Sequence, residues 1–504
     1  MANFTMKEIA TIVGGVLLQG DGSLCIDKFS TNSKIGDSST LFLPIIGERV
    51  DAHDYIGDAY QNGIRCTFTM RDFVETDTKD MTYLKVDSTV LALQRLGAYY
   101  REQFTLPIVG ITGSVGKTTT KEMIAAALET KLSVLKTEGN MNSQVGLPQM
   151  MMRIEKKHEV AIIEMGMSEF GEMERLATVA KPEFVVMTNI GVSHIGQLKT
   201  MENIRSEKAN ICNYLKEGST LLLNGDDPLL LEIATAYGSE DMTDYDRTQR
   251  INQLNLSEAT KERLCKARIV TFGTNPSCDI YADSIRTVDN STFFCYHDQT
   301  KAKDENEETE IELSVLGKHN ILNALAALYV ATSYGVNVST SKVGLKHYQP
   351  ISKRGEMEQL KEITWIDDTY NASPDSMKGA INILLELPKK NKKIIVFADI
   401  LELGDISRQC HYGVGEYLAT NSSPRLQDKD SIDLVVTIGD EAAYIAKAVK
   451  ENNRAIVTFS FDNKEMAKEF LLRELQVNDA ILFKGSRGMQ LDVLVKQLKE
   501  ELIR

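Results

Sequence analysis

One short stretch of the sequence carries residue types that could hold the phosphates of a nucleotide. It reads LPIVGITGSVGKTTTKEM, which is a β-branched run, a glycine turn with one lysine, and a helical pattern. Glycines in such a turn allow backbone N–H groups to converge on phosphate oxygens, and the following helix adds its positive end. The lysine would neutralise phosphate charge, and the next hydroxyl would ligate Mg²⁺. This predicted phosphate loop consists of Gly113, Ser114, Val115, Gly116, Lys117, Thr118 and Thr119.

The match to the P-loop pattern is incomplete, because Ile111 stands where the strict form has its first glycine. A glycine turn with an exposed lysine is the plainer interpretation of the same residues. The order of strand, turn and helix favours the nucleotide site.

Two further residues could complete a metal site beside this loop. Glu164 follows the apolar run VAIIEMG, and His194 lies in TNIGVSHIG. Mg²⁺ prefers hard oxygen ligands, and the carboxyl ends of parallel strands meet at one edge of a sheet. Taken alone, a glutamate at a strand end is commonly solvated and a single histidine is more often packed. Together with the phosphate loop, the two residues predict a magnesium site.

The elements that must position these residues indicate an α/β protein of three domains. Residues 1–104 alternate short β-rich pieces with polar turns and read as a small mixed α/β domain. Residues 105–349 show the rhythm of apolar strand, glycine turn and helix, which predicts a doubly wound P-loop domain of the ATPase type. Residues 350–504 repeat that rhythm as a Rossmann-like unit. A polar segment at about 236–312 is predicted to be a solvated elaboration of the central domain.

The composition limits the partners of the protein. The 504 residues carry a net charge of −14, from 57 basic and 71 acidic residues. This balance argues against nucleic acid as the main partner. No run approaches the roughly 18 apolar residues of a membrane span, and the seven scattered cysteines suggest neither disulfides nor a cysteine zinc site. We expect a cytoplasmic monomer that binds small molecules, with no nucleic acid and no membrane span.

Eight motifs follow one another in the order found in one known family. They are TGSVGKTTTKE, EGNMNSQVGLP, EMGMSEFGE, TNIGVSHIG, GKHNILNALAA, RGEME, DDTYNASPDSM and LELGD. With these motifs the sequence resembles the Mur ligases over nearly all of the chain except the 236–312 segment. DDTYNASPDSM and KGSRGM are similar to the members that add D-alanyl-D-alanine, and the Asp-Asn-Pro-Arg motif usual in the members that add the third residue is absent.

The resemblance implies an ATP- and Mg²⁺-dependent ligase that joins D-alanyl-D-alanine to UDP-N-acetylmuramoyl-tripeptide in peptidoglycan synthesis. The terminal carboxylate of the tripeptide would attack the γ-phosphate of ATP, giving an acyl phosphate and ADP. The amine of the dipeptide would then displace phosphate. Lys117 and Mg²⁺ would stabilise the negative charge that gathers in these steps. The first domain would bind the UDP-sugar, and the last would close on ATP and bind the dipeptide.

The resemblance also assigns roles to single residues around the nucleotide. It implies that Glu164 and His194 bind magnesium, and that Lys208 is a carbamylated metal ligand; an unmodified lysine near the phosphates is an equally open interpretation. It places Asn320 at the adenine, with His319 either beside the nucleotide or structural. From the last domain it implies nucleotide contacts for Arg354, Asp368, Tyr370 and Asn371.

For the other two substrates the resemblance implies sites at the ends of the molecule. UDP-substrate residues are expected to be Thr31, Ser33, Gly47, Glu48, Arg49, Asn140 and Asn142. The chain departs from the family at Ser143-Gln144, where Asn-Glu is usual. Dipeptide contacts are expected from Lys484, Ser486 and Arg487, for which a strand-end turn with solvated charges is the rival interpretation.

Two other functions are weighed beside this one. The first is another Mur-type ligase that adds the third residue, L-lysine or meso-diaminopimelate. The second is a nucleotide-binding scaffold that has lost catalysis, against which the intact set of Lys117, Thr118, Glu164, His194 and Asp368 argues. The third residue of the tripeptide is not specified by the sequence.

Overall fold

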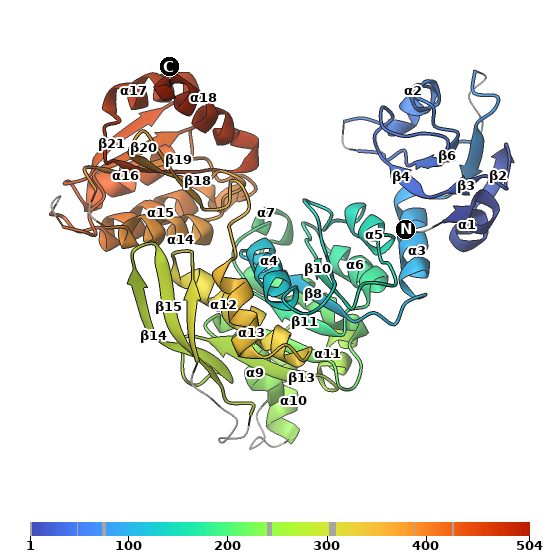
Figure 1. The fold of residues 1–504 in the computed structure, drawn as a ribbon, viewed down its shortest axis with the longest axis horizontal. Coiled ribbons are helices and arrows are strands. Elements are labelled where there is room, and N and C mark those ends of the chain that lie inside the picture. Colours follow the sequence, from blue (N-terminus) through green and yellow to red (C-terminus); the bar gives the residue numbers. More distant parts are fainter. Residues whose placement is uncertain are drawn as a thin grey trace.

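The chain forms three α/β units, each built on its own main sheet (Figure 1). This computed structural model describes residues 3–47, 49–72, 77–238, 244–301, 309–388, 390–425 and 428–503. The predicted fold class, a small mixed N-terminal domain followed by two doubly wound domains, is confirmed. The domain boundaries near residues 104 and 349 remain predictions.

The N-terminal sheet has parallel strands at its centre and one antiparallel edge strand. Its spatial order is β2 (Val16–Gln19), β7 (Thr82–Lys85), β6 (Cys66–Thr69), β5 (Thr40–Phe42) and β4 (Lys28–Ser30). A second, two-stranded sheet joins β1 (Phe4–Thr5) to β3 (Cys25–Ile26). The helices are α1 (Met6–Val13), α2 (Ile56–Gln61) and α3 (Thr89–Arg101), with a 3₁₀ turn over Ala52–Tyr55. Thr5 and Glu8 form a reciprocal capping box that begins α1.

Helix α3 attaches this unit to the centre of the molecule by apolar packing. Its Leu93, Leu96 and Tyr100 lie in one continuous core with residues of α5 and α6. Gly97 allows close approach, because a Cβ there would be 2.8 Å from the Cα of Pro148. The first two units therefore share one hydrophobic core.

The central sheet has nine strands, of which the middle ones are parallel and apolar on both faces. That pattern is expected when helices cover both sides. The strand order is β16 (Thr309–Leu313), β15 (Ser291–Asp298), β14 (Ile280–Val288), β13 (Arg268–Gly273), β12 (Thr220–Asn224), β11 (Phe184–Met187), β8 (Ile108–Thr112), β10 (Val160–Glu164) and β9 (Val134–Lys136). One face is covered by α4 (Lys117–Leu128), α12 (Lys318–Ser333) and α13 (Val338–Lys346). The other packs on α5 (Gly146–Met151), α6 (Glu172–Ala180), α8 (Met201–Ala209), α9 (Pro228–Gly238) and α11 (Glu258–Leu264). Smaller helices of this unit are α7 (Ile195–Leu198), α10 (Asp244–Gln253) and a 3₁₀ turn over Asn210–Tyr214.

The prediction of a solvated elaboration at 236–312 is wrong for most of the described part of that segment. Strands β13 to β16 extend the central sheet, and Phe272, Ile280, Phe294 and Tyr296 are buried in the core under α12. Along β16 the buried Ile311 and Leu313 alternate with Glu310 and Glu312, so charges on the outer face hide a core strand. Residues 239–243 and 302–308 lie outside the described residues.

The C-terminal sheet is parallel except at one edge. Its order is β17 (Glu356–Leu360), β18 (Ile363–Asp368), β22 (Ala480–Lys484), β19 (Lys393–Ala398), β20 (Leu434–Ile438) and β21 (Val457–Phe461). Helices α14 (Pro374–Glu386), α15 (Ser407–Asn421) and α16 (Ala443–Asn452) cover one face, and α17 (Lys464–Glu474) and α18 (Leu491–Ile503) cover the other. Short 3₁₀ turns occupy Gly404–Ile406 and Arg487–Met489. Trp365 is fully buried and stacks on Phe483 with 5.7 Å between ring centroids.

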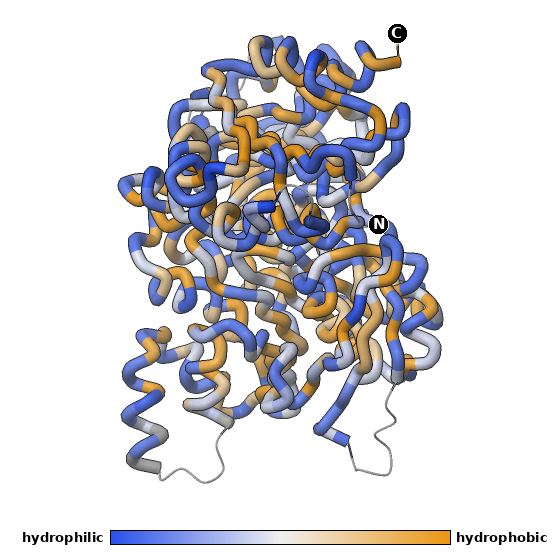
Figure 2. Tube along the Cα trace, turned by 90° about the vertical axis from the view of Figure 1, so that its left-hand side faces the viewer, coloured by the Kyte–Doolittle hydropathy of each residue, from blue (hydrophilic) through white to orange (hydrophobic). Residues whose placement is uncertain are grey.

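The three units are arranged around the central one. In Figure 1 the N-terminal unit lies to the right, joined through α3, and the C-terminal unit lies at the upper left above α12 and the β14–β15 hairpin. Hydrophobic segments concentrate inside the body of the molecule, and hydrophilic ones line its outside (Figure 2). None of the described helices is long and apolar enough to cross a membrane.

Candidate active site

The predicted phosphate loop is a tight turn between β8 and α4, with backbone conformations that require glycine. Gly113 and Gly116 have φ of 151° and 87°, and a Cβ on Gly113 would lie 1.9 Å from the hydroxyl of Thr188. No side chain caps α4 at Gly116, so the first N–H groups of this helix face the loop without a capping oxygen. The Lys117 ammonium is folded back over the loop, 2.7 Å from the carbonyl oxygen of Gly113. This arrangement suits an anionic ligand.

Oxygen ligands for a cation gather next to the loop. Glu164 ends β10, is 2% exposed, and accepts hydrogen bonds from the Thr118 hydroxyl and the Asn142 amide, both at 2.8 Å. Its backbone N–H donates to the Thr137 hydroxyl at 2.9 Å. The structure thus brings Thr118, Glu164 and Asn142 together.

Lys121 supports this cluster and was missed by the sequence reasoning. Its side chain is 1% exposed, and its ammonium donates to the Thr137 carbonyl at 2.6 Å. Lys121 lies one helical turn beyond Lys117, so the two lysines share one face of α4. Lysine is rarely fully buried, so a lysine at an inward-facing position of the helix pattern could have indicated that Lys121 has a role here.

Lys208 is buried beside the loop and donates to the Gly113 carbonyl at 3.1 Å. Burial lowers the pKa of Lys208 well below the usual lysine range, and the nearby Lys117 charge lowers it further. Burial likewise lowers the pKa of Lys117, partly offset by Glu164. Two buried ammonium groups thus lie beside the loop, and a phosphate ligand would bring negative charge to them.

His194 contacts the C-terminal unit. The His194 imidazole is 2.9 Å from the Glu402 carboxylate, which belongs to the C-terminal unit, and this contact lowers the pKa of Glu402. Within the described residues, no group of three or more His, Cys, Asp or Glu side chains could hold a metal ion. The metal role of His194 stays a prediction, and in this structure its Nδ1 is engaged by Glu402.

Strand ends of the C-terminal unit face the phosphate loop. Lys484, at the end of β22, is 3% exposed and pairs with Asp368 at 2.5 Å, at the end of the neighbouring β18. Burial raises the pKa of Asp368, and the Lys484 cation opposes that rise. The guanidinium of Arg354 lies 3.8 Å from the centroid of the Tyr370 ring. Asn371 accepts a hydrogen bond from Lys484 through its carbonyl, at 3.1 Å.

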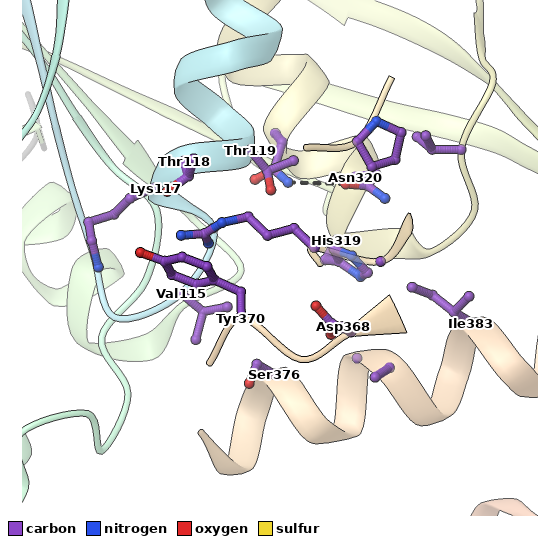
Figure 3. Close-up of a pocket in the computed structure, with 18 of the residues that line it drawn as sticks. Val115, Lys117, Thr118, Thr119, His319, Asn320, Asp368, Tyr370, Ser376 and Ile383 are labelled. Carbon is purple, nitrogen blue, oxygen red and sulfur yellow. Dashed lines mark hydrogen bonds between the residues drawn. The ribbon is translucent and has the colours of Figure 1, made fainter. Parts of the chain in front are cut away.

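A cavity of about 630 Å³ lies between the two units. Figure 3 shows Lys117, Thr118 and Thr119 on one side, Asp368, Tyr370 and Ser376 on the other, and Asn320 and His319 at the α12 end. The amide of Asn320 donates to the Leu316 carbonyl at 2.7 Å. The lining also contains Phe272, Asn290, Ser314 and Val315, which come from or follow the segment expected to be solvated.

The comparisons with known proteins agree along the whole chain. A family profile described as the Mur ligase middle domain matches residues 111–263 and 247–331, and one described as Mur ligase, glutamate ligase domain matches residues 353–487. A curated relative from Bacillus subtilis (strain 168), named UDP-N-acetylmuramoyl-tripeptide--D-alanyl-D-alanine ligase, is 33% identical over 503 residues, which cover 99% of each chain. The chain belongs to the Mur ligase family.

Two solved structures extend the likeness to three dimensions. MurF from Acinetobacter baumannii superposes with a TM-score of 0.83 at 29% identity and 99% coverage of both chains. MurF from Thermotoga maritima, in complex with ADP, superposes with a TM-score of 0.75 at 27% identity, covering 94% of this chain and 97% of that one. The family resemblance drawn from the motifs is confirmed, and within the family it is the MurF branch.

The residues predicted to bind the UDP-substrate of this Mur ligase lie at one edge of the N-terminal sheet. Thr31 and Ser33 follow β4, and Gly47 and Arg49 follow β5, its parallel neighbour. Thr31, Gly47 and Arg49 are exposed. Glu48 lies outside the described residues. None of the four described residues lines the cavity, so the predicted nucleotide-sugar site is separate from it.

Asn140 and Asn142 lie in the loop after β9 but have different partners. Asn142 holds Glu164, whereas Asn140 accepts a hydrogen bond from the Tyr370 hydroxyl. The departure at Gln144 has a structural role: its amide accepts from Gln94 of α3 at 2.8 Å and donates to the Glu172 carbonyl at 2.9 Å.

The three predicted dipeptide residues stay predictions, and two of them already have partners within the C-terminal unit. Lys484 is paired with Asp368 in the cavity, and the buried Ser486 hydroxyl accepts from the Leu401 N–H at 2.9 Å. Arg487 lies with its guanidinium 5.3 Å from the Tyr370 ring centroid. Lys484 lines the cavity and Arg487 does not, although the backbone N–H of Arg487 donates to Asn371, which lines it. Among the described residues no acid forms an ion pair with the Arg487 guanidinium.

Proposed function

We propose that this chain joins D-alanyl-D-alanine to UDP-N-acetylmuramoyl-tripeptide at the expense of ATP. The observation that carries the proposal is the full-length likeness to the ligases of that name, together with a phosphate loop that opens into a cavity between two domains. The ADP complex of the Thermotoga maritima neighbour supports ATP as the nucleotide. The product would be the UDP-linked pentapeptide, ADP and phosphate.

The chemistry requires two anions to meet. A tripeptide carboxylate oxygen attacks the γ-phosphorus, and the bond from that phosphorus to the β–γ bridging oxygen breaks, so ADP leaves and an acyl phosphate remains. The dipeptide amine then attacks the acyl carbon, loses a proton, and phosphate leaves with the electron pair of the C–O bond. Lys117 and Arg354 face this region and would stabilise the negative charge as it builds.

The residues present fit a magnesium ion. The Thr118 hydroxyl and the Glu164 carboxylate are hard oxygen donors 2.8 Å apart, and Mg²⁺ is bound through one or two such groups plus substrate phosphates. When bound, the ion would neutralise phosphate charge. Asn142 and Thr137 would keep the Glu164 carboxylate in place for it.

The two interpretations of Lys208 remain open as proposals, and one observation favours carbamylation. A lowered pKa leaves more of the amine neutral, which is the form that reacts with carbon dioxide. Carbamylation would also replace the positive charge of Lys208 with a negative one beside the loop. Electron density at Lys208, or recovery of a Lys208→Ala variant by short carboxylic acids, tests it.

The test of the activity is a complete reaction. ATP, UDP-N-acetylmuramoyl-tripeptide and D-alanyl-D-alanine should give phosphate in a one-to-one ratio with the pentapeptide product, and omission of the dipeptide should stop phosphate release. Binding of ATP without that release would favour the scaffold. Incorporation of L-lysine or diaminopimelate into a UDP-linked dipeptide would favour the other ligase.

The finer assignments are proposals on the same basis. We place the uridine diphosphate at the edge that carries Thr31, Ser33, Gly47 and Arg49, and the dipeptide carboxylate near Arg487. The enzyme is expected to act in the cytoplasm as a monomer. Comparing tripeptide substrates that end in lysine and in diaminopimelate would identify the third residue.

A further inference from the structure

Tyr370 makes three contacts that the proposed reaction does not explain by itself. It follows β18 in the C-terminal unit, and its ring extends toward the phosphate loop (Figure 3). The guanidinium of Arg354 lies 3.8 Å from the ring centroid and that of Arg487 lies 5.3 Å from it. The hydroxyl donates to the side-chain oxygen of Asn140, which belongs to the central unit. One side chain therefore touches two cations and the opposite domain.

Arg354 is the cation whose position matters to the phosphates. Its charge is among the causes that lower the pKa of Lys117, and it also opposes the rise in the pKa of Asp368. Arg354 therefore lies within electrostatic range of both walls of the cavity. In the described residues no carboxylate within 4 Å pairs with its guanidinium. Stacking on Tyr370 is the contact that orients it.

Asn140 belongs to the loop that holds the other wall in place. That loop begins at Thr137, which accepts the Glu164 N–H, and continues to Asn142, which donates to the Glu164 carboxylate. A bond from Tyr370 to Asn140 therefore connects the C-terminal unit to the segment that orients Glu164. Asn140 and Asn142 of the same loop are among the residues predicted to bind the UDP-substrate.

We propose that Tyr370 is a positioning residue, which orients Arg354 over the phosphate loop by stacking and ties the C-terminal domain to the 137–142 loop through Asn140. The proposal rests on the proposed function and adds to it a link between the two domains. Tyr370 need not touch the reacting atoms. Its ring and its hydroxyl have separate tasks, so variants can remove one task and keep the other.

The experiment is a double-mutant cycle on the full-length enzyme. Tyr370→Phe keeps the ring and loses the hydroxyl bond, Asn140→Ala loses its acceptor, and Tyr370→Leu loses ring and hydroxyl. We expect Tyr370→Phe to lower kcat/KM for ATP by about 3- to 10-fold, as for one lost hydrogen bond. Tyr370→Leu is expected to lower it by about 30-fold or more, because Arg354 also loses its support.

The double-mutant cycle shows whether Tyr370 and Asn140 act through their mutual hydrogen bond or contribute to activity independently. If the bond matters, Tyr370→Phe has almost no further effect in the Asn140→Ala background. Additive effects of the two substitutions, or a Tyr370→Leu variant with wild-type kcat/KM for ATP, would overturn the proposal. The matched control is Tyr412→Phe, which removes a tyrosine hydroxyl bond to Glu451 on the same domain and should leave activity unchanged.

Two readouts distinguish a positioning role from a loss of structure. The thermal unfolding temperature of Tyr370→Phe should match that of the wild type. Its loss of activity should appear in the kinetic parameters for ATP. The conservative Tyr370→Phe should lose less activity than Tyr370→Leu. ADP affinity, measured by calorimetry, tests the same cycle without turnover. A wild type that binds ADP but releases no phosphate would refute the proposed function; the ADP cycle would still decide the role of Tyr370.

Discussion

The two walls of the cavity are built in different ways. On the central wall each group is held by its own domain: Glu164 by Thr118, Asn142 and the Thr137 hydroxyl, and Lys117 by the loop carbonyl. On the C-terminal wall the groups are held by one another, as in the Asp368–Lys484 pair. The C-terminal unit contacts the central domain through Tyr370 to Asn140, His194 to Glu402 and the Gly317 N–H to Glu386, and Leu316 packs in its core.

The difference shows which wall of the cavity is formed when its own domain folds, without help from the other domain. The central wall keeps its geometry whatever the last domain does, because each hydrogen bond that orients it is local. The C-terminal wall keeps its internal pairs but depends on domain placement for its position against ATP. Loss of a central residue should therefore abolish chemistry, whereas loss of a C-terminal residue should weaken nucleotide use or stability.

The largest expected effect is at Lys117. Lys117→Ala should reduce turnover by about 1,000-fold or more, because the charge on the transferred phosphate loses its main cation. Binding of the UDP-substrate, measured by calorimetry, should stay within a few-fold of wild type, since its predicted site lies on another domain. The exposed Lys131→Ala serves as the control, and loss of both properties in Lys117→Ala would contradict the division of labour.

The next effect is at Glu164. Glu164→Gln keeps the shape and the bond to Thr118 but removes the anion, so we expect activity to fall by about 100-fold and the Mg²⁺ concentration for half-maximal rate to rise by about 10-fold or more. A magnesium titration of the steady-state rate measures both. An unchanged magnesium requirement would remove Glu164 from the metal site.

On the other wall, Asp368→Asn is expected to lower the free energy of unfolding of the C-terminal domain by about 2 kcal/mol, because Lys484 keeps a buried charge without a counter-ion. Trp365 is the single tryptophan of the chain and is buried in that domain, so its fluorescence in urea reports this transition. The double variant Asp368→Asn/Lys484→Met should regain stability but not activity. Asp37→Asn, at an exposed pair with Lys28, should change little.

The smallest expected effect is a change in the pH dependence of stability at Lys393, a buried lysine that lies away from the phosphate loop. Lys393 donates to the carbonyls of Leu385, Leu387 and Lys429, and burial lowers its pKa to about 8. Between pH 8 and the unfolded value of 10.5 the unfolded state holds more protons, so stability of the wild type should rise with pH in that window. Below pH 8 both states are protonated and the cost is constant.

The stability of Lys393→Met should not show the rise with pH that we expect for the wild type. The difference in slope between variant and wild type should be at most about 1.4 kcal/mol per pH unit, measured from the urea transition of Trp365 at several pH values from 8 to 10. Lys392→Met, at the partly exposed neighbour, is the control. Parallel pH profiles for wild type and Lys393→Met would show that the buried amine does not titrate in this window.

The sequence could predict what is local. The turn between β8 and α4 and the place of Glu164 at the end of β10 could be predicted, because strand, turn and helix follow directly in the chain, and hydrophobic patterning indicated the α/β class. The ligand roles of these residues stay predictions. Contacts across domains, such as His194 to Glu402 and Tyr370 to Asn140, could not be predicted, because they depend on where a folded unit lies rather than on any local pattern. Strands β14 and β16 were misjudged because outward charges, at Asp283 and Arg286 and at Glu310 and Glu312, diluted their alternation.

The shared core at α3 has a consequence for the distance between two of the proposed sites. Because α3 packs along its length on α5 and α6, the N-terminal and central domains behave as one block, which carries both the proposed UDP-substrate edge and the phosphate loop. The distance the tripeptide must span to reach the nucleotide is then built in when the chain folds.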